Sequence, residues 1–116
     1  MADSLLRLRD ALREFAAERD WDQFHSPRNL ATALIVEAAE LLEPFQWLDD
    51  EQASNLPPDT RAAVEQELAD VLLYLVRLAD RLDVDLAAAA QAKIVRNAMK
   101  YPIEKVRGSS RKVDEL

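Results

Sequence analysis

Apolar residues recur at three- and four-residue steps along most of the chain, which is the spacing of one face of an α-helix. This repeat predicts a first helix over residues 4–19, whose buried stripe we expect to consist of Leu5, Leu8, Leu12, Phe15 and Ala16. The next six positions, 20–25, break the period and predict a loop that carries Trp21 and His25.

Residues that start and stop helices divide the rest of the chain. Ser26 followed by Pro27 predicts a helix N-cap and a first helical residue. This second helix should end before Pro44, because the residue before a proline disfavours helical backbone. The remaining helices are predicted over 49–53, from the cap Asp59 to about residue 82, and over 86–100 with Asp85 as cap.

Two pairs of carboxylates lie beside the apolar stripes of the second and third long segments. The four residues are Glu37, Glu40, Glu67 and Asp70. Residues three apart lie side by side on a helix, so each pair shares one face. If the two helices face each other, all four acids converge, and their repulsion and desolvation favour a bound cation. Oxygen-only ligands suit Mg²⁺ or Mn²⁺ rather than zinc. Two further charged residues, Glu65 and Arg77, lie on the helix predicted from Asp59 to about residue 82, and both are expected to face solvent.

Aromatic and polar side chains near the ends of these helices are candidates for ligand contacts. Trp21 and Trp47 fit either a core or oligomer interface, or stacking on a nucleobase. His25 and Tyr74 fit either packing or substrate contact. A polar stripe in the last helix fits a plain exposed face, or the binding of phosphate oxygens and a sugar hydroxyl; its members are Lys93, Asn97 and Tyr101.

Composition supports an all-α fold and narrows the partners. The chain has 116 residues, of which 49% are hydrophobic, with one Gly and five Pro. Long breaker-free segments of this kind favour helix. We expect one helical domain over 1–105 and a basic tail over 106–116, which is either flexible or closes over a bound anion.

The net charge of −7 argues against binding to a nucleic-acid polymer or an anionic membrane. The absence of Cys excludes disulfides and thiolate metal sites. The N-terminal residues lack the apolar core of a signal peptide, and no apolar run is long enough to cross a bilayer. We therefore expect a cytoplasmic protein.

Several segments, taken in order, resemble the MazG-like nucleotide pyrophosphohydrolases, and in particular their dCTP pyrophosphatase-like branch. The segments are residues 15–30, Glu37 to Leu41, Phe45 to Trp47, 67–75, Lys93 to Pro102, and 107–116. The resemblance covers nearly the whole chain, and all four acidic residues are present within it.

This resemblance implies an all-α, MazG-like bundle of about four main helices that assembles as a dimer or tetramer. It implies Mg²⁺-dependent cleavage of a (deoxy)nucleoside triphosphate, dCTP-like, between the α and β phosphates, which would clear surplus nucleotides. The catalytic metal ligands would be Glu37, Glu40, Glu67 and Asp70. Contacts to the base would come from Trp21, Trp47 and Tyr74. Contacts to phosphate and sugar would come from Lys93, Asn97 and Tyr101, with Arg111 or Lys112 from the tail.

Two rival functions remain open from the sequence. One is a bundle that binds divalent metal without hydrolysis, and the other is a helical interaction module whose acidic pairs are surface residues.

Overall fold

The computed structural model describes residues 2–111, so the predicted tail residue Lys112 lies outside the described range. The described residues form α-helices and two short 3₁₀ turns, without a β-strand. The elements are α1 (Ala2–Glu18), η1 (Asp22–Phe24), α2 (Pro27–Leu42), η2 (Glu43–Phe45), α3 (Asp50–Ser54), α4 (Pro58–Arg81), α5 (Leu86–Lys100) and α6 (Ile103–Val106). The all-α prediction is confirmed. No helix within residues 2–111 is long and apolar enough to cross a membrane.

Helix caps confirm most of the predicted starts. The Ser26 side chain accepts a hydrogen bond from the backbone of Asn29 at the start of α2, and Asp85 does the same for Ala88 in α5. The predicted Asp59 cap is wrong, because α4 begins at Pro58 without a side-chain cap. A proline in the first helical turn has no N–H to satisfy, and its ring presets a helical φ, so the N-cap is Pro57 and the helix begins two residues earlier than predicted.

Three short elements were not predicted as such. The expected loop over 20–25 contains the turn η1, and η2 continues the chain through Pro44, where α2 was expected to stop. Proline removes a hydrogen bond of the α ladder, but its φ still suits a tighter 3₁₀ turn. The helix α6 extends across the boundary predicted between a domain over 1–105 and a tail.

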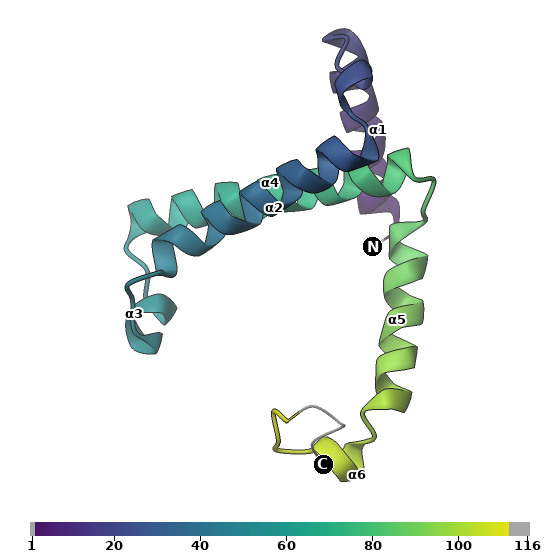
Figure 1. Cartoon of the computed structure of the whole chain (residues 1–116). Helices are drawn as coiled ribbons and strands as arrows, with labels where there is room; N and C mark the ends of the chain where they lie inside the picture. The colour runs from purple at the N-terminus through teal and green to yellow at the C-terminus, as the bar shows by residue number, and fades with distance from the viewer. Residues whose placement is uncertain (1, 112–116) are drawn as a thin grey trace. The chain divides into compact units, whose positions relative to one another are not determined.

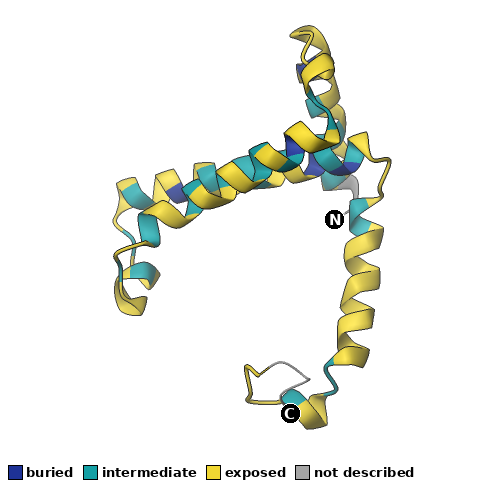
Figure 2. Cartoon of the chain, in the orientation of Figure 1, coloured by how far each residue is buried: buried dark blue, intermediate teal, exposed yellow. Residues whose placement is uncertain are grey.

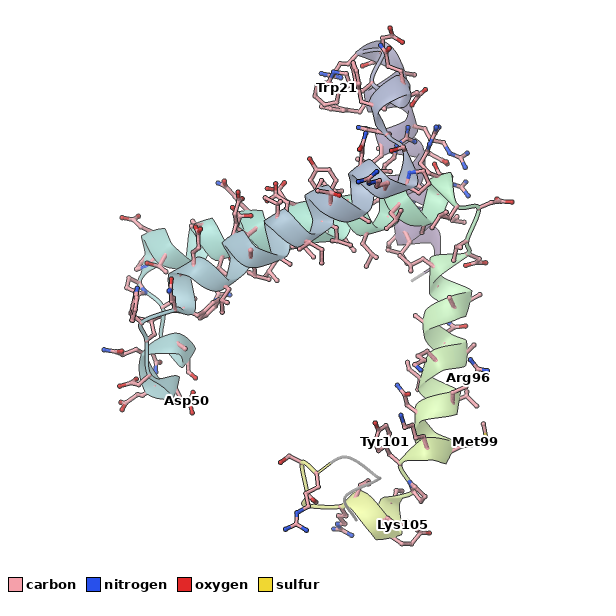
Figure 3. All side chains as sticks on the ribbon, in the orientation of Figure 1. Trp21, Asp50, Arg96, Met99, Tyr101 and Lys105 are labelled. Carbon is pink, nitrogen blue, oxygen red and sulfur yellow. The ribbon has the colours of Figure 1, made fainter. Side chains whose placement is uncertain are left out.

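The chain divides into two compact units, the first ending at Val84 and the second beginning at Asp85. In the first unit α2 and α4 run antiparallel along each other, and α1 lies across α4 (Figure 1). The second unit contains α5 and α6; Figure 3 shows Arg96 and Met99 on α5, and Tyr101 just past its end. The extent of the helical domain, 1–105, stays a prediction.

The buried apolar residues of the first unit come from its three long helices. They are Ala16, Leu30, Val64, Val76 and Ala79 (Figure 2). Phe15 of the stripe predicted for the first helix is instead exposed, and so are three leucines of α4: Leu68, Leu72 and Leu75. The reason is that α4 is apolar around more than one face, and within the described unit α1 and α2 cover only part of it.

Arg77 was expected to face solvent, but its side chain is only 5% exposed. It forms ion pairs with Asp22 from η1 and with Asp80 one turn further along α4. Asp80 also accepts a hydrogen bond of 2.8 Å from Arg13 of α1. The hydrogen bond from Arg13 holds the pKa of Asp80 below its ordinary value. We call Arg13, Asp22, His25, Arg77 and Asp80 the Arg77 network, since these residues join α1, the loop and α4.

Replacing Arg77 should destabilise the fold, because Asp80 would lose one partner in a buried setting. We expect Arg77→Met to lower the free energy of unfolding by about 3 kcal/mol in urea denaturation at neutral pH. The matched control is Arg61→Met on the same helix, where the exposed pair with Glu65 should contribute no more than about 0.5 kcal/mol. Equal effects of the two substitutions would contradict a structural role for the network.

Candidate metal and substrate site

Three carboxylates meet where α2 packs against α4. Glu37 of α2 and the pair Glu67 and Asp70 of α4 each place a carboxylate oxygen within 4.8 Å of the others. All three side chains are partly buried. The i, i+3 spacing on α4 puts two of them on one face, and the antiparallel neighbour supplies the third. The predicted convergence of acids from two helices is therefore seen for three of the four residues.

Two oxygens in this cluster have no partner. Oε2 of Glu37 and Oε2 of Glu67 are buried and accept no hydrogen bond from any residue within 2–111. Buried carboxylate oxygens are ordinarily paired or coordinate a metal, because an unpaired buried charge is costly. The cluster thus has unused acceptor capacity within the described part of the chain.

The fourth predicted ligand, Glu40, is partly buried one turn further along α2 and lies outside the group of three. Glu40 nevertheless interacts electrostatically with the cluster. The pKa of Glu40 is raised, chiefly through hydrogen-bond sharing with Glu37. The pKa of Glu37 is raised as well, chiefly through the side-chain interaction of its carboxyl group with that of Glu67 and secondarily through burial. Crowded carboxylates therefore hold protons more tightly than isolated ones.

These residues fit a hard divalent cation. The donors are all oxygens, two of them lack another partner, and a cation would relieve the repulsion that raises the pKa of Glu37. A set of three or four carboxylates without His or Cys is unsuited to a structural zinc site. The cluster can thus hold a hydrated cation that keeps free positions for ligand oxygens.

A cavity of about 400 Å³ adjoins this cluster in the first unit. Its wall is mostly apolar, with Leu8, Leu12 and Leu30 among the lining residues. Asp70 belongs to both the wall of the cavity and the acidic cluster. A ligand could therefore place an apolar ring in the cavity and an anionic group beside the carboxylates.

Three predicted ligand-contacting residues, Trp21, His25 and Tyr74, line this cavity. Asp20 adopts a left-handed φ of 54°, which turns the chain after α1 and brings Trp21 back over it. The Trp21 ring then packs edge-on against Phe15, with 5.6 Å between the ring centroids. Figure 3 shows Trp21 beyond the end of α1.

The other predicted contacts are not part of this cavity. Trp47 is 86% exposed and follows α2, so it lies at the opposite end of that helix from Trp21. Lys93 and Asn97 are exposed on α5, and Tyr101 is its C-cap residue. These three belong to the second unit, and Arg111 lies at the end of the described range. The roles of all five residues stay predictions.

Sequence reasoning missed Arg77 as a site residue. It lines the cavity, and its Nε donates a hydrogen bond of 3.1 Å to Nδ1 of His25. One indication was available, since Arg77 interrupts an otherwise apolar run between Val71 and Ala79. Its partners could not be inferred, because Asp22 and His25 lie more than fifty residues earlier in the chain.

A family model described as the MazG-like family matches residues 33–116, which include the acidic cluster, the whole of α4 and α2 from residue 33 on. The chain belongs to the MazG-like family. A solved structure similar to this MazG-like chain is a pyrophosphatase from Archaeoglobus fulgidus. It has a TM-score of 0.80 and 39% sequence identity, over 85% of this chain and 93% of that one.

Curated relatives are similar at higher identity. dCTP pyrophosphatase 1 of Homo sapiens is 52% identical over 105 residues, and that of Mus musculus is 51% identical over the same length. Each alignment covers 89% of this MazG-like chain and 62% of the relative. The chain thus spans about three-fifths of the length of these relatives.

Removing one acid from the cluster should stabilise the metal-free protein and weaken its metal binding. We expect Glu37→Gln to raise the melting temperature of the metal-free protein, because it removes a negative charge crowded against Glu67 and Asp70. The melting temperature of the unsubstituted chain should rise on adding Mn²⁺ or Mg²⁺, and that of Glu37→Gln should change much less. Differential scanning fluorimetry with a chelator and then with metal measures both effects.

The matched control is Glu65→Gln, an exposed acid on α4 that is outside the cluster. It should respond to metal as the unsubstituted chain does. An equal metal response from Glu37→Gln would show that the cluster is not the binding site.

Proposed function

We propose that this MazG-like chain is a divalent-metal-dependent nucleotide pyrophosphohydrolase. Its substrate would be a (deoxy)nucleoside triphosphate, with dCTP or a similar pyrimidine nucleotide favoured, cleaved between the α and β phosphates to a monophosphate and pyrophosphate. The observation that carries this proposal is the position of Asp70, which is shared by the acidic cluster and the cavity wall. A nucleotide has the same two parts side by side: a flat base and an anionic phosphate chain.

The metal would be Mg²⁺, with Mn²⁺ as a possible substitute, held by Glu37, Glu40, Glu67 and Asp70. When bound, it would neutralise phosphate charge and lower the pKa of a water nucleophile. The same four carboxylates are the proposed catalytic residues, because one of them must accept the proton of the attacking water at its oxygen. Among the described residues, Oε2 of Glu37 and Oε2 of Glu67 have no hydrogen-bond partner, so either could accept a proton without breaking an existing hydrogen bond.

The base would occupy the cavity, in contact with Trp21, His25 and Tyr74. An aromatic wall suits a nucleobase, because stacking on such side chains contributes about 1–3 kcal/mol per base. The names of the relatives, dCTP pyrophosphatase 1, support a cytosine nucleotide. The proposed role is the clearing of surplus nucleotides, and the proposed location is the cytoplasm. Trp47 remains a proposed base contact, and the phosphates and sugar are assigned to Lys93, Asn97 and Tyr101.

The chain would act as a homo-oligomer, a dimer or a tetramer. The α2–α4 pair has an uncovered apolar surface that includes Ile35, Val36 and Leu68, each more than half exposed. Surfaces of this kind on a small helical unit are typical of protein interfaces.

An assay of a nucleotide panel tests the activity directly. With Mg²⁺, we expect dCTP to yield monophosphate and pyrophosphate in equal amounts. Anion-exchange chromatography of the reaction mixture measures both products. Asp70→Asn and Glu37→Gln should each lower kcat by at least about a hundredfold, since each removes a carboxylate that would bind metal or accept a proton. Glu65→Gln is the matched control and should retain activity.

Other outcomes favour the rivals. Release of orthophosphate and a diphosphate would contradict cleavage between the α and β phosphates. Tight Mn²⁺ binding without turnover of any nucleotide would favour a metal-binding bundle. If the chain neither bound Mn²⁺ nor hydrolysed any nucleotide, an interaction module would be favoured.

Light scattering after size-exclusion chromatography tests the assembly. We expect a mass at least twice that of one chain, and we expect Leu68→Lys to shift the mass toward the monomer, because a charge would replace an apolar contact. Leu6→Lys on α1, where the leucine is 43% exposed, is the control and should leave the mass unchanged. A monomeric mass for the unsubstituted chain would overturn the proposed oligomer.

A further inference from the structure

The imidazole of His25 lies between the cavity and the buried guanidinium of Arg77. Its Nδ1 accepts a hydrogen bond of 3.1 Å from Nε of Arg77. An arginine side chain has only donors and does not lose its proton in proteins. Nδ1 must therefore carry a lone pair toward Arg77 and cannot carry a hydrogen.

The protonation state of the ring follows from this contact. A neutral imidazole has one protonated and one unprotonated nitrogen, so with Nδ1 unprotonated the hydrogen is on Nε2. Burial lowers the pKa of His25, and the charges of Arg77 and Arg81 act in the same direction, against the opposing effect of Asp22; this shift agrees with the neutral ring that the Arg77 contact requires. No residue within 2–111 forms a hydrogen bond with Nε2, and His25 lines the cavity.

Arg77 is itself held in place from several sides. Asp22, three residues before His25, pairs with one guanidinium nitrogen, and Asp80 pairs with another. Arg81, one turn further along α4, donates to the backbone oxygen of His25 with a distance of 3.1 Å. The contacts with Asp22 and Asp80 thus fix the direction in which Arg77 points its Nε–H donor. The imidazole ring of His25, which accepts from this donor, therefore has one preferred orientation.

We propose that Arg77 is a positioning residue that fixes His25 as the neutral Nε2–H tautomer, so that the cavity presents a fixed N–H donor to its ligand. The ligand class is a nucleobase with a carbonyl oxygen or an unprotonated ring nitrogen, which would accept from Nε2. This last step rests on the proposed function, whereas the tautomer does not. Selectivity follows because a base that placed a donor group opposite Nε2 would leave the Nε2–H unpaired, whereas a base that placed an acceptor there would pair with it.

Nitrogen NMR of the uniformly labelled chain tests the tautomer without any substrate. His25 is the only histidine, so its two ring nitrogens give one unambiguous pattern. We expect Nε2 to show the chemical shift of a protonated ring nitrogen and Nδ1 that of an unprotonated one at neutral pH. A proton on Nδ1, or a mixture of tautomers, would overturn the proposal.

Substitution of Arg77 tests whether it causes the tautomer. Arg77→Met should give averaged shifts from both tautomers, whereas the control Arg61→Met should leave the pattern unchanged. If Arg77→Met folds and still shows pure Nε2–H, Arg77 is not the positioning residue. If Arg77→Met does not fold, the next pair of variants decides instead.

That pair separates the two nitrogens of His25. An asparagine amide lies about as far from the backbone as Nδ1, and a glutamine amide about as far as Nε2. We expect His25→Asn to keep an acceptor for Arg77 and thus the higher melting temperature. We expect His25→Gln to keep a donor in the cavity and to have the lower KM, by about tenfold, with a smaller difference in kcat.

A purely structural role for His25 predicts instead that KM follows stability, so a lower KM for His25→Asn, or equal values, would overturn the proposal. The failures are distinguishable. A chain that hydrolyses no nucleotide refutes the proposed function, and the NMR pattern still decides the tautomer. A chain that hydrolyses dCTP but has the proton on Nδ1 refutes only this inference.

Discussion

The antiparallel packing of α2 against α4 is the interaction on which the rest of the first unit depends. It buries Leu30 and Val64, and the same contact forces Glu37 toward Glu67 and Asp70. Burial of apolar surface is favourable by about 25 cal/mol per Å², and a part of that gain is offset by crowding the carboxylates. The site is therefore maintained by apolar packing that surrounds it, and not by attraction among its own residues.

The structure of the cavity likewise depends on both apolar packing and polar contacts. Leucines from α1 and α2 form its wall, while the Arg77 network fixes the loop that carries Trp21 and His25. Ion pairs with excellent geometry are better at specifying one arrangement than at adding stability, since desolvation offsets much of their attraction. A loop with a tryptophan 43% exposed has few apolar contacts of its own, so directional bonds determine where it lies.

The sequence was sufficient for the features that depend on neighbouring residues. The caps Ser26 and Asp85 and the i, i+3 spacing of Glu67 and Asp70 follow from local geometry, and they were predicted correctly. Features set by distant residues were not. Periodicity placed Phe15 in the core and Arg77 in solvent, and both predictions were wrong, because the pattern along one helix does not show which of its faces the neighbouring helices cover. Trp47 and Lys93 are both exposed in the described part of the chain, so neither local pattern nor packing assigns them a role.

The Arg77 network has a consequence for the order in which the chain acquires its structure. Its contacts join residues separated by 52, 55 and 67 positions in the sequence. Closing such long loops costs entropy that is recovered only after the intervening helices have paired. We therefore expect the wall of the cavity to be completed late in folding, after the α2–α4 contact. A ligand pocket that forms last cannot bind its ligand in partly folded chains, so binding selects molecules in which the whole first unit is assembled.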